Sequence, residues 1–474
     1  MSKVNYKKLG KDTVAFGLSS MASKVMAYFL LPIYTAVLST EEFGFADTLL
    51  TLVNLLYPIL TFAISEALLR FTMDTSDKLK RNEYVTATMT IVGIATLLLL
   101  AAGYFVKFFN TKLYSYWIYV VLLFLGFNFE KCTAYYTKAI GKTRLVALAG
   151  VFHTMSLIVT NILLLVVFKV GILGYIWAMI FSYFATSCFH ILGGKLWRYA
   201  GFSRVKRETF AIMLRYSTPM IVTIMAWWLN TTSNKYIIEF SLGISARGLY
   251  AAAYKIPTII SSLTNIFIDA WKLTMYSSNK DEVDGSFYSV YKNLGKFTAL
   301  IVIVLSVASE LVGKIMFSKD YFSAWKCIPF LAAAVYFSTL TGYLASAITK
   351  SKATSRLLVG TLIGASLNIA LGILLVPKYG IVAAAITTYL GFMVSWLIRM
   401  VQVRKIVEFK INLRTELLNV ICITAMAVIM SFNIPNKYFI ALPIFIIAVI
   451  NNFGFIKDVF IMIFSFINKS KSKE

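Results

Sequence analysis

Long apolar stretches alternate with short polar segments along almost the whole chain. Each stretch holds about 20 residues with few charges, which is the length that an α-helix needs to cross the hydrocarbon core of a bilayer. This rule predicts about fourteen membrane-spanning helices. They begin near Thr13, Phe43, Tyr84, Tyr114, Thr143, Gly171, Ala211, Ala246, Asn293, Tyr321, Ala353, Gly380, Thr415 and Tyr438. The pattern therefore predicts an all-α integral membrane protein.

The composition supports this fold class. Of the 474 residues, 59% are hydrophobic and only 14% are charged, and the mean hydropathy is +0.76, values that a soluble globular domain does not reach. The 46 lysines and arginines outnumber the 21 acidic residues, which raises a nucleic-acid partner as an alternative. The cations occur in short clusters between apolar stretches rather than on one surface, so we expect no nucleic-acid partner.

The placement of the cations predicts how the helices are oriented. If the amino terminus is cytoplasmic, the inner loops of the first half hold most of its cations, namely Lys78, Lys80, Arg81, Lys138, Lys142, Arg144, Lys195, Arg198, Arg204, Lys206 and Arg207. The outer loops carry about one cation each, so both termini are expected in the cytoplasm. No loop is long enough to fold as a separate domain. Binding is therefore expected within the helix bundle, without enzymatic chemistry.

The chain also contains an internal repeat. Gly44 and Gly248 follow the first and seventh predicted helices and lie 204 residues apart. Further matches pair Asn161 with Asn368 and Gly171 with Gly380, at offsets of 207 and 209 residues. Because six helices return the chain to the same side, the two copies should be parallel, as in many transporters. We expect a six-helix lobe over residues 1–205, a second over 206–408, and two further helices with a basic tail over 409–474.

One charge inside the first predicted helix needs an explanation. Lys24 lies near the middle of the stretch VAFGLSSMASKVMAYFLLPIYTAVL, where a lysine on an isolated helix costs about 2.5 to 3.5 kcal/mol. Ser20 and Ser23 share the small, polar face of this helix with Lys24. That face is expected to line a hydrated cavity, where the penalty largely disappears.

Polar stripes on other helices predict the same cavity. In the eighth predicted helix a long stripe follows helical spacing through Tyr250, Tyr254, Thr258, Ser261, Asn265, Asp269, Lys272 and Tyr276. The second helix repeats it with Asp47, Thr51, Asn54, Pro58, Thr61 and Ser65. In the seventh helix, Trp227 and Asn230 share one side. The alternative is that these residues only hold helices together, since small and polar side chains favour close packing in membranes.

Four other charges have more than one interpretation. Glu66 and Arg70 are spaced i and i+4 near the inner end of the second predicted helix, where they can pair with each other or gate a path. Lys235 and Lys255 lie toward the outer ends of the seventh and eighth helices. They suit either a substrate exit site or an anchor at the membrane surface.

The sequence resembles the polysaccharide flippases of the O-antigen and teichuronic-acid type, within the multidrug/oligosaccharidyl-lipid/polysaccharide (MOP) exporter superfamily. The resemblance spans nearly the whole chain and is most specific in LLPIYTAVLSTEEFGFADTLLTLV with the following EALLRF, and in LRYSTPMIVTIMAWWLNTTSNKYIIEFSLGISARGLYAAAYKI continuing to AWKLTMY. This chain keeps Pro219, Gly248 and Tyr250 of the family pattern. It has Asn234 and Lys235 where an acid-base pair is usual, which leaves an ion-pair gate there without its acid.

The resemblance implies two six-helix lobes, alternating access, and a substrate in which a short oligosaccharide is linked through diphosphate to undecaprenol. We expect Lys24 to attract the diphosphate, and Asn54, Trp227, Asn230, Tyr254 and Asn265 to contact the sugars. Asp269 and Lys272 are expected to form a coupling or gating pair. Two members of the same superfamily remain as alternatives: a peptidoglycan-precursor (lipid II) flippase and a multidrug cation antiporter.

Other expectations follow from this interpretation. We expect a monomer in the bacterial cytoplasmic membrane, surrounded by membrane lipids, with a polysaccharide polymerase as a further partner. No cofactor is expected, although a proton or sodium ion is a candidate coupling ion. A membrane glycosyltransferase or polymerase would need an acidic metal-binding motif or a large outer loop, and the sequence has neither.

Overall fold

The computed structural model of the chain describes residues 28–198, 201, 203–277, 280–350, 354–407, 413–432 and 434–471. All regular secondary structure in these residues is helical, and twelve of the helices are long and apolar enough to cross a membrane. Helix α11 (Ile244–Ser277) is also long enough, but its polar stripe makes it less apolar. The helix expected near Thr13 begins outside the described residues. The all-α membrane fold predicted from the sequence is therefore confirmed.

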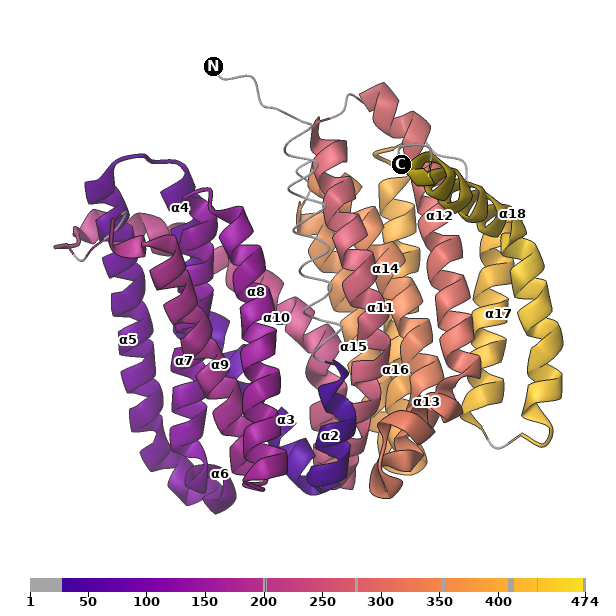
Figure 1. Cartoon of the computed structure of the whole chain (residues 1–474), viewed down its shortest axis with the longest axis horizontal. Helices are drawn as coiled ribbons and strands as arrows, with labels where there is room; N and C mark the ends of the chain where they lie inside the picture. The colour runs from indigo at the N-terminus through magenta and orange to yellow at the C-terminus, as the bar shows by residue number, and fades with distance from the viewer. Residues whose placement is uncertain are drawn as a thin grey trace. The chain divides into compact units, whose positions relative to one another are not determined.

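The chain divides into two units, Met1–Thr232 and Ser233–Glu474. Unit 1 is ordered along the chain as α2 (Leu30–Val37), α3 (Thr40–Leu60), α4 (Ile64–Met73), α5 (Lys78–Phe109), α6 (Thr111–Ser115), α7 (Trp117–Ala139), α8 (Thr143–Asn161), the π-helix η1 (Ile162–Val167), α9 (Ile172–Gly194), the short 3₁₀ helix η2 (Leu196–Arg198) and most of α10 (Arg207–Leu242). Helix α7 lies at its centre, in contact with α3, α4, α5 and α9 (Figure 1). The unit boundary falls inside α10, and the lobe boundary at residue 205 stays a prediction.

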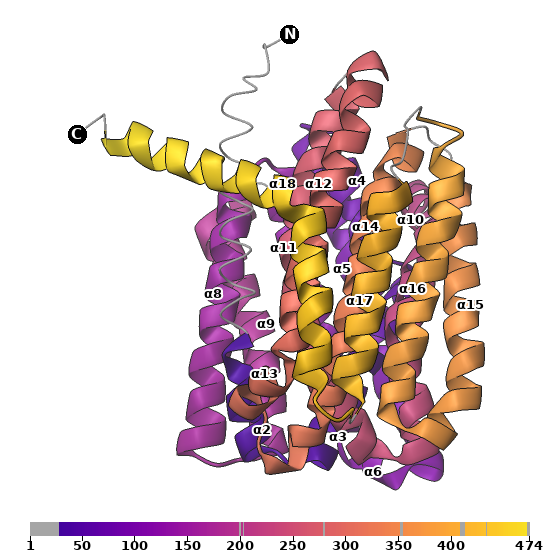
Figure 2. The ribbon, with the colours of Figure 1, turned by 90° about the vertical axis from the view of Figure 1, so that its right-hand side faces the viewer.

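Unit 2 continues with α11, α12 (Lys280–Val307), α13 (Ser309–Met316), the 3₁₀ helix η3 (Lys319–Cys327), α14 (Ile328–Lys350), α15 (Thr354–Tyr379), α16 (Ile381–Val403), α17 (Leu413–Ser431) and α18 (Lys437–Lys471). Helix α14 is the core of this unit, because it contacts α11, α12, α16 and α17 and buries almost all of its side chains. Figure 2 shows α17 and α18 side by side along the outside of the unit.

The repeat seen in the sequence has a structural counterpart in each unit. Gly44 is the fifth residue of α3, and Gly248 is the fifth residue of α11. Gly171 and Gly380 are the N-cap residues of α9 and α16, and both have a positive φ, of 66° and 75°. A left-handed backbone at this turn favours glycine. The pairs α5·α7, α7·α9 and α8·α9 of unit 1 recur in unit 2 as α12·α14, α14·α16 and α15·α16.

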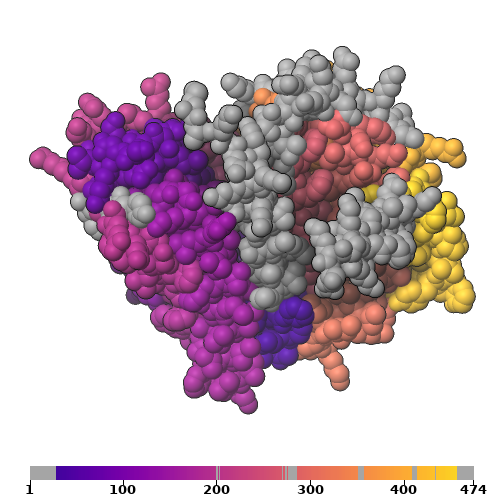
Figure 3. Space-filling model, turned by 45° about the horizontal axis from the view of Figure 1, so that its top comes forward, coloured from indigo at the N-terminus to yellow at the C-terminus, as the bar shows by residue number. Residues whose placement is uncertain are grey.

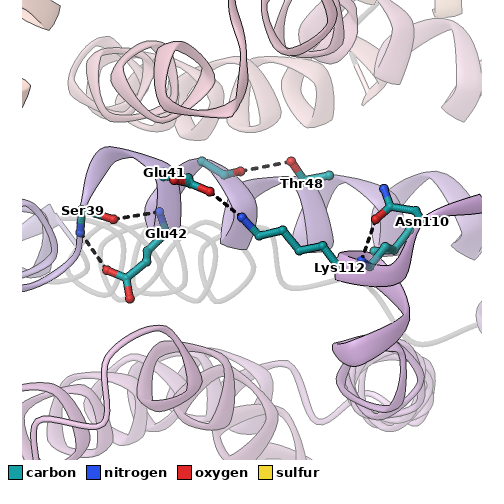
Figure 4. Close-up of polar contacts among 8 residues, drawn as sticks. Ser39, Glu41, Glu42, Thr48, Asn110 and Lys112 are labelled. Carbon is teal, nitrogen blue, oxygen red and sulfur yellow. Dashed lines mark hydrogen bonds and ion pairs between the residues drawn. The ribbon is translucent and has the colours of Figure 1, made fainter. Parts of the chain in front are cut away.

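One end of unit 1 is organised by the start of α3, at the sequence STEE (Figure 4). Ser39 Oγ accepts from the Glu42 amide at 3.1 Å, and Glu42 Oε2 accepts from the Ser39 amide at 2.9 Å. This reciprocal capping box satisfies two backbone donors at the helix start. Lys112 of α6 donates to Glu41 Oε1 at 2.5 Å and thereby joins the turn after α5 to α3. The opposite end, with α4 and the first turns of α5, forms the indigo surface at the upper left of Figure 3.

An ion pair attaches the two extra helices to unit 2 at the turn between them. Lys437 Nζ, at the start of α18, lies 2.6 Å from Glu310 Oε2 of α13 and 4.4 Å from the centre of the Trp325 ring. Tyr438 also donates to Glu310, at 3.1 Å. The hydrogen bond from Lys437 holds the pKa of the Glu310 carboxyl below its usual range. The Lys437 and Glu310 side chains are 16% and 21% exposed, so this charged hydrogen bond is largely shielded from solvent and holds the start of α18 against α13.

Helices α15 and α16 approach each other closely at a point lined by glycine residues. The hydroxyl group of Ser395 on α16 can donate to two carbonyl oxygens. One is that of Gly360 on α15, at 3.2 Å, and the other is that of Gly391 on its own helix, at 2.9 Å. A Cβ added at Gly364 would lie 1.9 Å from Ser395 Oγ and 2.5 Å from the Gly391 carbonyl oxygen. Small residues of this kind are how membrane helices bring their backbones together.

We predict that Gly364→Ala lowers the free energy of unfolding by about 1 to 3 kcal/mol, because the added methyl group must force α15 away from α16. The measurement is the thermal or denaturant unfolding of the purified protein in detergent. Gly93→Ala in α5 is the matched control, since a Cβ there meets nothing within 4 Å. The control should be neutral or slightly stabilising. Equal losses in both variants would contradict the close packing.

Candidate functional site

Three of the predicted substrate residues, Lys24, Ser20 and Ser23, lie outside the described residues. Their placement on a cavity-facing helix stays a prediction. The other predicted residues are distributed over the two units, and each unit contains its own buried polar cluster. These clusters are described separately below.

The polar cluster of unit 1 forms beside a break in the second membrane-spanning segment. Helix α3 contains Pro58 and ends at Leu60, and α4 begins at Ile64. Between them Phe62 and Ala63 have φ values of 53° and 49°. A non-glycine residue in this left-handed region costs about 1 kcal/mol or more. The break therefore stores strain, and broken helices of this kind line binding sites in transporters.

Glu66 of α4, just after the break, contacts residues of α7. Lys131 Nζ lies 3.5 Å from Glu66 Oε1, with 19% and 23% of the two side chains exposed. Tyr135 donates to the same carboxylate oxygen at 3.0 Å. The Lys131 ammonium also lies 3.9 Å from the centre of the Tyr57 ring. Tyr57 itself shares a 2.7 Å hydrogen bond with Ser65 across the break. A mostly buried lysine is thus balanced by one carboxylate and the faces of tyrosine rings.

Pairing with Arg70 was one of the possibilities that the spacing left open for Glu66, and the structure has a different partner for each residue. Arg70 Nε lies 3.2 Å from Asp74 Oδ2, and both of these side chains are more than half exposed. Glu66 is half-buried where α4 packs against α7, whereas Arg70, one turn further along α4, is exposed. Lys131, which the sequence analysis did not place at the site, is the partner that Glu66 takes instead.

The remaining predicted residues of unit 1 have different exposures. Asn54 is exposed on α3, and its amide donates to the Leu50 carbonyl oxygen of the preceding turn at 2.9 Å. Trp227 of α10 is 67% exposed, whereas Asn230 on the same helix is buried at 6%. Asn54 and Trp227 are therefore accessible to a ligand or to lipid in this structure, and Asn230 is less so.

The predicted residues of unit 2 lie on α10 and α11. Lys235 is half-buried, with its ammonium 5.7 Å from the centre of the Tyr254 ring, so the structure brings these two residues together. Lys255 is half-buried on α11, and Asn265, further along the same helix, is exposed. Lys272 Nζ lies 2.9 Å from Asp269 Oδ1, and 72% of the Asp269 side chain is exposed. This ion pair is local to α11 and screened by solvent, so it adds little stability.

The most connected polar group in unit 2 is the side chain of Asn234, which is only 3% exposed. Its Nδ2 atom has four oxygen neighbours: Asn368 Oδ1 at 2.9 Å, the Ala384 carbonyl at 2.8 Å, Thr387 Oγ1 at 3.0 Å and Thr388 Oγ1 at 2.8 Å. We call these four atoms the oxygen cage. An amide carries two N–H donors, so it serves two of the four oxygens at a time.

The oxygen of the Asn234 amide, in contrast to its nitrogen, has too few partners. Its Oδ1 atom is buried and accepts no hydrogen bond in the described part of the chain. The hydroxyl groups of Tyr250 and Thr388 lie 3.0 Å apart and extend the network to α11. The cage thus joins α10, α11, α15 and α16 of unit 2 through one neutral side chain. It occupies the place where the family pattern has an acid.

Sequence reasoning identified parts of this network without assembling it. Asn368 was an anchor of the repeat, and Asn234 was noticed only as a departure from the family pattern. Another buried group, Arg399 of α16, was missed: it is 6% exposed and donates to Thr361 Oγ1 at 2.8 Å and to the Leu357 carbonyl oxygen at 3.1 Å. The signal for it was an arginine inside an apolar stretch, the same signal that singled out Lys24.

We predict that Asn234→Asp lowers the free energy of unfolding by about 2 to 4 kcal/mol in a buffer with only a bulky organic cation, because a buried carboxylate has no N–H to donate to Asn368 Oδ1 and the Ala384 carbonyl oxygen. Added sodium should then raise the melting temperature, since carboxylate, hydroxyl and carbonyl oxygens are ligands for hard cations.

Asn452→Asp in α18 is the control. Asn452 is also fully buried, but its amide donates only to Asn419 Oδ1 at 3.0 Å and to the Ala448 carbonyl at 2.8 Å. Loss of stability without recovery by sodium is expected there. The same sodium response in both variants would contradict a special role for the oxygen cage.

Comparison with solved structures places this fold among known transporters. The chain resembles the lipid II flippase MurJ in an inward closed conformation, with a TM-score of 0.69, 14% identity, and coverage of 95% of this chain and 100% of that one. It also resembles a multidrug resistance MATE family transporter of the MOP superfamily in its inward-facing conformation, with a TM-score of 0.63, 14% identity, and coverage of 82% and 97%. At this identity the likeness defines the fold.

Sequence comparison adds a curated relative and a family. An uncharacterized membrane protein of Methanocaldococcus jannaschii is 30% identical over 111 residues, which are 23% of this chain and 21% of the relative. The match thus spans about a fifth of that protein. Residues 9–271, more than half of the chain, match the family described as "Polysaccharide biosynthesis protein". The chain therefore belongs to the polysaccharide biosynthesis protein family, as a multi-pass membrane protein with the fold seen in the MurJ and MATE structures.

Proposed function

We propose that the protein is a flippase that moves undecaprenyl-diphosphate-linked oligosaccharide units from the cytoplasmic to the outer leaflet of the bacterial cytoplasmic membrane. The observation that carries the proposal is the match of residues 9–271 to the polysaccharide biosynthesis family, in a chain with the fold of MurJ. The fold supplies many helices and no large loop, which suits a cargo that must pass between leaflets while its lipid tail stays in the bilayer.

The substrate chemistry agrees with the charged and polar residues. A diphosphate brings at least two negative charges through the membrane and needs cations or hydrogen-bond donors along its path. Lys24 would attract it. The accessible side chains of Asn54 and Trp227 in unit 1, together with the less accessible Asn230, would contact sugars, as would Tyr254 and Asn265 in unit 2. Lys235 and Lys255 would hold the diphosphate near the outer end.

The balanced pair of Glu66 and Lys131 supports a switching role for unit 1. A carboxylate and a lysine beside a strained helix break would form the element that changes its arrangement during alternating access. Arg70, which pairs with Asp74 at the surface, would act at the inner mouth. Both termini are proposed to face the cytoplasm, as the distribution of cations favours. The working form would be a monomer in contact with membrane lipids, delivering its product to a polysaccharide polymerase.

The role of Lys24 can be tested in liposomes that contain the purified protein and a fluorescent undecaprenyl-diphosphate oligosaccharide. Lys24→Gln should lower the rate of transbilayer movement at least tenfold, and Lys24→Arg should keep most of it, because only the charge is required. Unchanged movement in Lys24→Gln would exclude this role.

The same liposomes distinguish the alternatives. Movement of lipid II in preference to the oligosaccharide lipid would indicate a peptidoglycan-precursor flippase. Uptake of a cationic dye without lipid movement would indicate a drug antiporter. Against the latter, the first helix offers a lysine that would repel a cation.

A further prediction concerns energy coupling through Asp269. Outward movement of an anion is favoured by an inside-negative potential by about 2.3 kcal/mol per charge per 100 mV, so the potential alone can drive the cycle. If a proton or sodium ion is also exchanged at Asp269, transport will depend on pH or sodium, and this dependence will vanish in Asp269→Asn. Lys272→Gln is the matched control, because it removes the ion pair but keeps the carboxylate. A dependence that persists in Asp269→Asn would contradict coupling at this residue.

A further inference from the structure

A basic hollow lies at the end of unit 1 where α10 begins. It has a volume of about 650 Å³, and its described lining residues are Arg204, Val205, Lys206, Arg207 and Glu208. Three cations and one acid give it a net charge of two positive units. Val205 is its only apolar member among these residues. A hollow of this size can take a small polar ligand or a lipid headgroup.

The segment around the hollow is held to α5 by two hydrogen bonds from its backbone and one from a side chain. The Gly201 amide donates to Asn82 Oδ1 at 2.7 Å, and the Ser203 amide donates to Thr86 Oγ1 at 3.0 Å. On the other side, Thr209 donates to Glu83 Oε2 at 2.7 Å. Residues 204–208 are therefore held between anchored positions and not at the tip of a free loop. Such preorganisation lowers the entropy lost when a ligand binds.

The cations of the hollow differ from other basic residues of the inner loops. Arg204, Lys206 and Arg207 are exposed and have neither an ion pair nor a side-chain hydrogen bond in the described residues. By contrast, Arg81 donates to the Thr75 carbonyl at 2.7 Å, and Lys142 donates to the Gly194 carbonyl at 2.5 Å. The positive-inside rule explains why cations occur here, but it does not require three of them to surround one hollow without partners.

The chemistry of the hollow favours a phosphate group. Arginine forms paired hydrogen bonds with phosphate oxygens, and lysine adds a point charge. Arg207 is also the first residue of α10, so the free amides and the positive dipole end of a 36-residue helix lie beside these side chains. Glu208 weakens the attraction for an anion, but the charge of the lining residues stays positive.

We propose that residues 204–207 bind the phosphate groups of lipid headgroups in the leaflet next to this end of unit 1. Two lipids carry this chemistry: the diphosphate of the lipid-linked substrate, held before it enters the protein, and an anionic phospholipid of the bulk membrane. The first source rests on the proposed function and orientation, and the second does not.

The test uses the full-length protein in a neutral detergent and measures dissociation constants by thermophoresis. Farnesyl diphosphate is the probe for a polyprenyl diphosphate, with farnesol as its uncharged control. Phosphatidylglycerol in mixed micelles is the probe for an anionic phospholipid, with phosphatidylcholine as its control. The variant carries Arg204→Gln, Lys206→Gln and Arg207→Gln together.

The matched variant carries Lys78→Gln, Lys80→Gln and Lys138→Gln. These three lysines are also exposed on inner loops by the proposed topology, but they do not line the hollow. Both variants lose three positive charges, so a general charge effect would weaken binding equally. Melting temperatures of both variants show that the fold is kept.

We expect the first variant to raise the dissociation constant at least tenfold, the matched variant to change it less than twofold, and binding to weaken as salt is added. Loss of farnesyl diphosphate binding assigns the hollow to the substrate. Loss of phosphatidylglycerol binding alone assigns it to the bulk lipid. Equal losses in both variants, or no binding of either probe to the unmodified protein, would overturn the proposal.

This outcome is independent of transport. If the hollow binds phosphatidylglycerol while liposomes show no lipid movement, the proposed flippase function fails and the headgroup site stands. If liposomes show transport but neither probe binds, the headgroup site fails and the flippase function stands.

Discussion

Inside a bilayer a polar group can be satisfied only by other groups of the protein, and this constraint governs the structure at every level. It makes every crossing a helix, because a helix pairs its own backbone donors and acceptors. It also favours buried polar side chains that have partners within their unit. Lys131 takes Glu66 and the Tyr57 ring, and Asn234 takes the oxygen cage. The polar clusters of the two units are consequences of the same requirement.

The constraint also explains where the helices depart from regular geometry. The break at residues 61–63 separates α3 from α4, and the π-helix η1 follows directly after Asn161. Irregular backbone at membrane depth is tolerated where other protein groups surround it. Both irregular segments lie in unit 1, whereas the matching helices α11 and α15 of unit 2 continue without a π-helix or a left-handed break. The two copies of the repeat share helix packing and have diverged in their polar chemistry.

The pair of asparagines at the repeat illustrates this divergence. Asn161 donates to the Leu157 carbonyl at 2.7 Å, and its Oδ1 atom accepts no hydrogen bond from the described residues. Asn368, its counterpart, accepts from Asn234 across α10 and α15. The asparagine at this position of the repeat thus makes a contact within its own helix in unit 1, and it joins a network between helices in unit 2.

The sequence by itself determined the membrane class, the helices, the repeat and the family. These depend on hydrophobic length and on residue spacing, and both are local properties that the chain carries in order. It also indicated which polar residues share a helical face, such as Asp269 and Lys272. Only the tertiary structure decided which residues meet across helices. Glu66 pairs with Lys131, 65 positions away, and not with Arg70 on its own helix, because α4 packs against α7. Helical periodicity gives the face of a residue but not its neighbour, since the neighbour depends on how the helices pack and where their backbone bends.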